Sequence, residues 1–285
     1  MSEHLFYHSD MDGHAGGVIL FQKGMFPHEM DYDHYRSPKE FVNPGDDVWI
    51  VDYSFQPGAM LWLKENAGRV VWIDHHKSAI NDSRMYGYDD LEGIREVGPS
   101  GAELAWRFMR GKEPAPRFIR LAGDYDTYRS YGKRNFAREV VPFHYGSDMI
   151  LADVVPGSFG AERLKDDGFL ADIMEKGQVI RQFKDMEAKA IYRESAYVRN
   201  LWGHRCLCVN TPEPGSLYLT MTGIFDPAKH DLMFTYSFDG KVWSYGWYTN
   251  GHPEVDCSEI ARQYGGGGHA SASGAHSDKP IEGIF

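Results

Sequence analysis

The sequence is poor in cysteine and has no long apolar run. Its 285 residues include only three cysteines, Cys206, Cys208 and Cys257, an odd number that does not suit a disulfide framework. We therefore expect buried free thiols and a cytoplasmic protein. No apolar stretch is long enough to span a bilayer. The N-terminal residues lack a basic segment followed by an apolar one, so we also expect no signal peptide.

Positive charge is scarce as well. The chain has 30 lysine and arginine residues against 41 acidic ones, a net charge of −11. Because an acidic surface repels the phosphate backbone, we expect no binding to long duplex nucleic acid. A short anionic substrate in a local site stays compatible with this charge, above all where bound metal ions supply the positive charge.

The first half of the chain alternates apolar runs with helical patterns. Apolar, strand-like runs occupy residues 4–8, 47–55 and 69–76, and helical patterns occupy 14–24, 57–68, 100–111 and 115–126. This alternation is typical of α/β proteins with a parallel sheet. In the helix over 100–111, Ser100 and Glu103 have the spacing of a capping box.

The second half has a different character. Residues 168–195 form one long amphipathic helical pattern. The segments 205–211, 217–224 and 231–249 are β-rich, Asp-Gly at 239–240 predicts a hairpin turn, and residues 257–264 predict a short helix. We therefore predict an N-terminal domain over 1–167, a connecting helix over 168–195 and a smaller α/β domain over 196–285. We detect no internal repeat.

Metal-binding side chains gather at four points of the first half. They are "HSDMDG" with His8, Asp10 and Asp12, "VDYS" with Asp52, "DHH" with Asp74, His75 and His76, and "GDYD" with Asp124 and Asp126. Each group follows an apolar strand, although the last can instead follow a helix. Because parallel strands converge at their carboxyl ends, residues far apart in sequence can share one site there. His8, Asp10 and Asp12 would face one side if the backbone stays extended.

Mixed aspartate and histidine ligands suit Mn²⁺, Fe²⁺ or Zn²⁺ better than Ca²⁺. The number of candidate ligands exceeds the need of one ion and fits a pair about 3.5–4 Å apart that share a bridging carboxylate. Each group also has a structural interpretation. Asp52 alone would be a cap or turn residue, the first group could be a turn or a Ca²⁺ loop, and Ser100 could serve only as a helix cap. It is their common position after predicted secondary-structure elements that favours a shared site.

These four groups resemble, in order, the motifs of the DHH phosphoesterase superfamily. The segment "GGGGHASASG" (265–274) is similar to the glycine-rich "GGGH" motif of the DHH-associated C-terminal domain. The resemblance covers nearly the whole chain, and within the superfamily it points to the compact bacterial oligoribonucleases, or nano-RNases. It implies an active site in a cleft between the two domains.

The resemblance also assigns roles residue by residue. His8, Asp10 and Asp52 would hold one ion, whereas Asp12, Asp52, His75 and Asp124 would hold the other. Asp126 competes with Asp124 for the last role, and Asp124 is preferred because it comes first after the apolar segment. Asp74 would orient His75, and His76 would contact the scissile phosphate. The predicted substrate-binding residues are Ser100, Gly266, Gly267, Gly268 and His269.

The resemblance implies a hydrolase that uses two divalent ions, with Mn²⁺ favoured. Its expected substrates are short single-stranded RNA or dinucleotides, which it would cleave to mononucleotides as a phosphodiesterase or exonuclease. Two alternatives stay open: a 3′-phosphatase acting on adenosine 3′,5′-bisphosphate, and a non-catalytic nucleotide-binding module. The sequence leaves open the cleavage polarity, the preference for RNA over DNA and the oligomeric state, for which a homodimer is one option. It also gives no role to residues 127–165, where basic residues follow the fourth motif.

Overall fold

The computed structural model covers residues 1–285, and the structure is described for all of them except 33, 130–134, 212–223, 250–253 and 285. The chain divides into two compact units, Met1–Gln178 and Val179–Phe285. None of the helices in the described part of the chain is long and apolar enough to cross a membrane.

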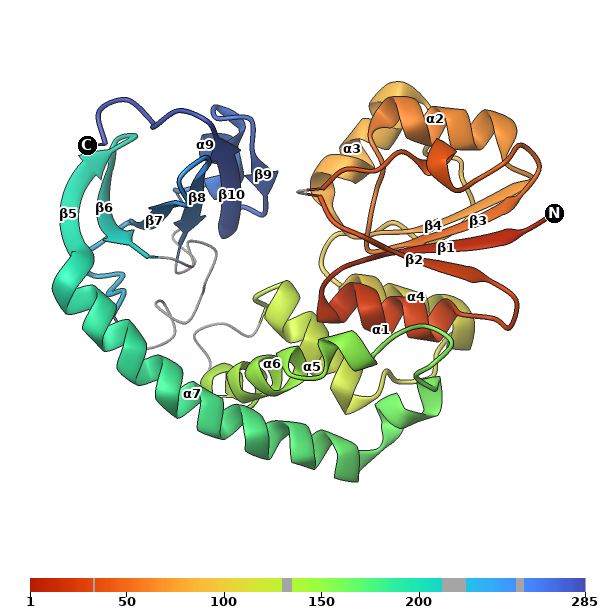
Figure 1. Ribbon diagram of the computed structural model, residues 1–285, viewed down its shortest axis with the longest axis horizontal. Helices are drawn as coiled ribbons and strands as arrows, with labels where there is room; N and C mark the ends of the chain where they lie inside the picture. The colour runs from red at the N-terminus through yellow and green to blue at the C-terminus, as the bar shows by residue number, and fades with distance from the viewer. Residues whose placement is uncertain (33, 130–134, 212–223, 250–253, 285) are drawn as a thin grey trace. The chain divides into compact units, whose positions relative to one another are not determined.

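The first unit is built on a four-stranded parallel sheet in the order β2-β1-β3-β4. Its strands are β1 (Glu3–His8), β2 (Phe26–Met30), β3 (Asp47–Val51) and β4 (Arg69–Ile73). Helices α1 (Met11–Leu20) and α4 (Gly101–Arg110) lie on one face, and α2 (Pro57–Asn66) and α3 (Lys77–Tyr86) lie on the other (Figure 1). The parallel α/β sheet predicted from the sequence is confirmed.

The interior of this unit explains why β1, β3 and β4 are nearly continuous apolar runs. Strands covered on both faces have no polar side to display. Phe6, Ile50 and Trp72 are fully buried and pack in one cluster with Met60 and Leu63 of α2. Burying each of these side chains contributes about 1.5–3 kcal/mol. This packing fixes the carboxyl ends of the three strands relative to one another.

Strand β2 was not predicted. It is mostly exposed, contains Pro27 and forms the edge of the sheet beside β1. Proline removes a backbone donor, so strands that contain it are restricted to sheet edges. The exposed side chains also give β2 no apolar pattern by which the sequence could reveal it.

The rest of the first unit is helical. It comprises the single-turn elements η1 (Pro38–Glu40), η3 (Leu151–Asp153) and η4 (Ala161–Lys165), helix α5 (Arg117–Asp126), the π-helical segment η2 (Phe136–Val140) and helix α6 (Val141–Asp148). Helix α7 (Asp167–Ser195) is 29 residues long and runs from the first unit into the second. The unit boundary therefore falls inside a helix.

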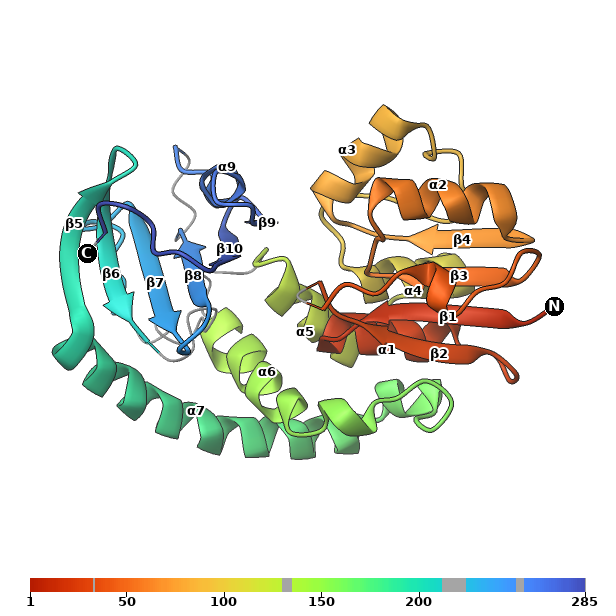
Figure 2. The ribbon, with the colours of Figure 1, turned by 45° about the horizontal axis from the view of Figure 1, so that its top comes forward.

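The second unit is a mixed six-stranded sheet in the order β5-β6-β7-β8-β10-β9. Its elements, seen in Figure 2, are β5 (Ala196–Leu201), β6 (His204–Asn210), β7 (Leu232–Phe238), β8 (Trp243–Tyr248), α9 (Cys257–Arg262), β9 (Gly267–Gly268) and β10 (Ala272–Ser277). Among these described strands, β6 and β7 pair in parallel and the other neighbours pair antiparallel. This unit confirms the predicted smaller α/β domain.

Three local predictions can be compared with this sheet. The Asp-Gly hairpin joins β7 to β8, and the Asp239 carboxylate accepts hydrogen bonds from the backbone N–H groups of Lys241 and Val242. All three cysteines are free and buried, as expected. Most of the β-rich segment predicted at 217–224 lies outside the described residues.

Candidate metal centre

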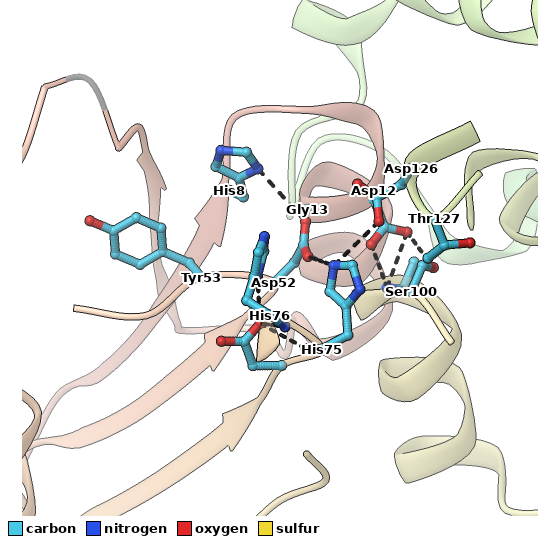
Figure 3. A network of polar contacts seen from close by, with 12 residues as sticks. His8, Asp12, Gly13, Asp52, Tyr53, His75, His76, Ser100, Asp126 and Thr127 are labelled. Carbon is cyan, nitrogen blue, oxygen red and sulfur yellow. Dashed lines mark hydrogen bonds and ion pairs between the residues drawn. The ribbon is translucent and has the colours of Figure 1, made fainter. Parts of the chain in front are cut away.

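Three adjacent strands of the first sheet, β1, β3 and β4, deliver polar side chains at their carboxyl ends. Strand β1 ends at His8, and Asp52 directly follows β3. Strand β4 leads into Asp74, His75 and His76. Because the strands are parallel and adjacent, these ends meet at one edge of the sheet. Figure 3 shows His8, Asp52 and His75 turned toward the same small region.

The first motif adds two aspartates to this region through helix α1. Asp10 caps the helix, and its carboxylate accepts a hydrogen bond from the backbone N–H of Gly13 at 2.8 Å. Asp12 lies in the first helical turn and is buried. The expectation that His8, Asp10 and Asp12 alternate along extended backbone was wrong for Asp12, because the strand ends at His8 and the helix begins at Met11.

Asp52 lies at the middle of the cluster. One of its oxygens is 3.0 Å from Nε2 of His75, and the other is 3.8 Å from Nδ1 of His8. Its backbone has a φ of +55°, a left-handed conformation that non-glycine residues adopt rarely and that concentrates at functional sites. Gly101 packs directly on it, since a Cβ at that position would lie 2.5 Å from the Asp52 Cβ.

The side chains form three overlapping groups that could each hold a metal ion. The groups are His8 with Asp10 and Asp52, Asp12 with His75 and Asp126, and Asp52 with His75 and His76. Within each group the candidate ligand atoms lie within 4.8 Å of one another. Asp52 belongs to two groups, so its two oxygens can face two different ions.

The electrostatics of the cluster are dominated by crowded carboxylates. Burial, followed by repulsion from Asp12 and Asp10, raises the pKa of Asp52 well above its ordinary value. Burial and the nearby Asp126 raise the pKa of Asp12 to about 7. Burial lowers the pKa of His8, but the carboxylates of Asp10 and Asp52 outweigh it and raise this pKa to about 9.

These observations fit a divalent cation. Both carboxylate oxygens of Asp52, and one of Asp126, are buried and accept no hydrogen bond from any described residue. Their near neighbours are the imidazoles of His8 and His75, and crowded buried carboxylates are costly unless they pair with cations or coordinate a metal. Carboxylate and imidazole ligands together suit a first-row divalent ion such as Mn²⁺.

The fourth motif is placed differently from the prediction. Asp126, the last residue of α5, lies 3.3 Å from Nε2 of His75, whereas Asp124 accepts a hydrogen bond from Arg129 at 2.9 Å. The motif is helical, and residues two apart on a helix point in different directions. The preference for Asp124 over Asp126 is therefore reversed by the geometry.

Asp74 also has a different partner from the expected one. Its carboxylate is 2.7 Å from Nδ1 of His76 and accepts the backbone N–H groups of His75 and His76. The imidazole that Asp74 orients is thus that of His76, not that of His75. Burial lowers the pKa of His76, but Asp74 outweighs burial and raises it to about 9, so His76 is cationic at neutral pH in the metal-free protein.

Ser100 has the capping role considered for it and also makes a contact that was not predicted. It caps α4, and the capping box with Glu103 is present. The Ser100 hydroxyl also donates a hydrogen bond of 2.6 Å to the Asp12 carboxylate, and the Ala102 N–H lies 3.3 Å from both oxygens of that carboxylate. Ser100 therefore orients a candidate ligand, while its predicted contact with substrate stays a prediction.

The predicted substrate-binding glycines belong to the second unit. Gly266 donates a backbone hydrogen bond to the Ala261 carbonyl, and Gly268, the last residue of β9, has a φ of +131°. His269 donates its N–H to the Ala272 carbonyl at 2.7 Å. The role of this glycine segment toward substrate stays a prediction.

Two residues near the centre had no predicted role there. Arg129 contacts both Glu103 and Asp124. Tyr32 lies beside the cluster, with its ring centroid 5.2 Å from that of His8 and 5.8 Å from that of His76. The only sequence signal for Arg129 was its position three residues after Asp126, and Tyr32 had none.

Comparison with known proteins identifies the fold. No family model matches the chain. The structure resembles the DHH domain of PF0399, described as a member of a family of ribosomal proteins, with a TM-score of 0.59 and 15% identity over 96% of this chain and 82% of that one. It also resembles RecJ from Thermus thermophilus in complex with Mn²⁺, with a TM-score of 0.53 and 15% identity over 97% of this chain and 49% of RecJ. The fold is therefore that of DHH-domain proteins.

A sequence comparison adds a relative of known class. The chain is 24% identical to the oligoribonuclease NrnB of Bacillus subtilis (strain 168), in an alignment that covers 99% of this chain and 74% of NrnB. The resemblance to DHH phosphoesterases of the nano-RNase type, predicted from the motifs, is thereby confirmed.

Proposed function

We propose that the chain is a metal-dependent phosphodiesterase that hydrolyses short oligonucleotides or dinucleotides to mononucleotides. The observation that carries this proposal is the buried Asp52 carboxylate, whose two oxygens face two groups of metal-type ligands. The similarity to the oligoribonuclease NrnB supports the substrate class. The net charge of −11 supports a local, metal-dependent contact with phosphate rather than a basic binding surface.

In this proposal, His8, Asp10 and Asp52 hold one ion, and Asp12, Asp52, His75 and Asp126 hold the other. We favour Mn²⁺, the ion bound in the RecJ structure that shares this fold. When bound, such a pair of ions lowers the pKa of water and neutralises phosphoryl oxygens. The chain itself supplies the imidazole of His76, held by Asp74, to face the substrate phosphate.

The second unit carries the remaining residues that we propose for substrate binding. Gly266, Gly267, Gly268 and His269 would contact a phosphate group of the substrate, because backbone N–H groups at glycine can approach phosphate oxygens closely.

The test is a hydrolysis assay with Mn²⁺ on a dinucleotide and on adenosine 3′,5′-bisphosphate in parallel. We expect cleavage of the dinucleotide, and its loss in a His75→Ala variant that remains folded. Release of phosphate from the bisphosphate alone would identify a 3′-phosphatase instead. Binding of nucleotide without turnover of either compound would identify a non-catalytic module.

A further inference from the structure

We propose that Arg129 is a positioning residue for the ion held by Asp12 and Asp126. This inference rests on the proposed metal centre and identifies what fixes the spacing of two of its ligands. Arg129 follows α5 and contacts one carboxylate on α4 and one on α5.

The guanidinium group makes three short hydrogen bonds. Its Nη1 and Nη2 donate to the two carboxylate oxygens of Glu103 at 2.6 and 2.9 Å, and its Nε donates to Asp124 at 2.9 Å. A bidentate pair fixes orientation as well as distance, because the planar fork of arginine matches a carboxylate. Arg129 therefore locks the first turn of α4 to the last turn of α5.

Each partner of Arg129 leads to a candidate ligand. Glu103 also accepts the backbone N–H of Ser100 at 3.0 Å, and the Ser100 hydroxyl donates to Asp12. Asp124 lies two residues before Asp126 on the same helix. The position of the Arg129 fork thus determines the separation of the Asp12 and Asp126 carboxylates, which belong to one candidate metal group.

The packing around Gly123 shows independently that this junction is tight. A Cβ at Gly123 would lie 2.7 Å from the Ser100 hydroxyl, 3.0 Å from a Glu103 oxygen and 3.1 Å from the Arg129 Nη2 atom. Helix α5 therefore rests directly on the cap of α4. A methyl group added at Gly123 would therefore displace the carboxylates of Asp12 and Asp126.

The charge balance argues against a direct role in phosphate binding. Arg129 already pairs with two carboxylates, so the three groups together carry a net negative charge. Such a group attracts a cation rather than a phosphate. Arg129 therefore acts on the metal ligands.

The experiment is a calorimetric titration of the purified full chain with Mn²⁺. We expect R129Q to weaken one of two binding events roughly tenfold or more, as is typical when a group that orients a metal ligand is removed. R129K should recover part of the affinity, because lysine can pair with one carboxylate but cannot reproduce the fork. G123A should resemble R129Q. The matched control is R117Q, since Arg117 begins α5, the helix that Arg129 follows, and pairs with Glu139 at 2.9 Å.

Kinetics separate positioning from substrate contact. At saturating Mn²⁺ we expect R129Q to regain most of its kcat, with an unchanged KM for a dinucleotide. An R129Q titration indistinguishable from that of the wild type would overturn the inference, as would unaltered Mn²⁺ affinity combined with a raised KM. Thermal unfolding of R129K and G123A shows whether any loss of binding reflects loss of the fold.

A D126N variant distinguishes failure of the inference from failure of the proposed function. If D126N removes the binding event that R129Q weakens, the inference holds even if the wild type hydrolyses no dinucleotide. If D126N leaves every binding event of the wild type intact, no ion is held there and the inference falls.

Discussion

Asp52 combines a strained backbone with a buried, crowded carboxylate. Its φ of +55° disfavours most side chains, although asparagine tolerates this conformation better than alanine does. Neither oxygen accepts a hydrogen bond from the described residues, and burial raises its pKa well above the ordinary range. Asp52 therefore lowers the stability of the metal-free chain. The same carboxylate supplies a ligand that two ions can share.

Because Asp52 destabilises the metal-free chain and is also a candidate ligand, an Asp52→Asn variant should have opposite effects on stability and on metal binding. Replacing the crowded carboxyl group by an amide, while keeping a residue suited to positive φ, should stabilise the metal-free protein by about 0.5–2 kcal/mol. The same change should abolish hydrolysis and the stabilisation by Mn²⁺. Thermal unfolding with and without Mn²⁺ measures both effects. A variant less stable than the wild type in chelator would contradict this interpretation of Asp52.

The raised pKa values of His8 and Asp12 predict pH-dependent metal binding. His8, with a pKa of about 9, and Asp12, with a pKa of about 7, must each lose a proton to coordinate an ion. The affinity for Mn²⁺ should therefore fall as the pH drops from 9 to 6. Titrations in buffers of different ionisation enthalpy would report the protons released, and no release at pH 7 would count against the prediction.

Both raised pKa values also make the metal-free chain less stable as the pH rises, each over its own pH range. The raised pKa of His8 contributes stability below about pH 6.5, which is lost as the pH rises through about 9. Asp12, whose ordinary pKa is 3.8, destabilises the fold as the pH rises from about 4 to 7. An Asp12→Asn variant should lose the second dependence and keep the first.

At the scale of elements, α2 and α4 each have a glycine in the first turn, one with open space around it and one that is tightly packed. Gly101 begins α4 against Asp52, whereas a methyl group added at Gly58, in the first turn of α2, would have nothing within 4 Å. Helical glycine costs stability unless close packing requires it. The requirement is met at Gly101 and not at Gly58.

Alanine substitutions at these glycines should therefore change stability in opposite directions. Gly58→Ala should stabilise the protein by about 0.4–1 kcal/mol. Gly101→Ala should destabilise it by about 1–3 kcal/mol through overpacking and should displace Asp52, with loss of Mn²⁺ affinity. Denaturant unfolding of both variants gives the comparison. Equal stabilisation by the two substitutions would mean that Asp52 is not held by α4.

The elements themselves show what the sequence could and could not reveal. Strands β1, β3 and β4 were predictable because both of their faces are buried, and the three ligand groups after them followed from the parallel sheet. The exposed edge strand β2 had no such pattern. The choice between Asp124 and Asp126 depended on which side of a helix faces His75, and the partner of Asp74 depended on the turn after β4. Those facts arise from tertiary packing.

At the scale of the whole molecule, the candidate metal ligands all belong to the first of two compact units. An ion that binds only the folded site stabilises it by about 2.7 kcal/mol at 100 times its Kd. Hydrogen exchange should therefore slow on adding Mn²⁺ in β1, β3, β4 and α1, while β6 and β7 of the second unit exchange as before. Equal slowing in both sheets would show that the units open as one.

The three buried thiols have a practical consequence for labelling. Burial is the main cause that raises the pKa of Cys206, Cys208 and Cys257 to about 12, 11 and 12, so none is an exposed thiolate at neutral pH. The natural chain should not react with maleimide reagents while it is folded. One engineered surface cysteine on each unit would then accept a fluorophore pair, and energy transfer between the dyes would measure the separation of the two labelled positions with and without Mn²⁺.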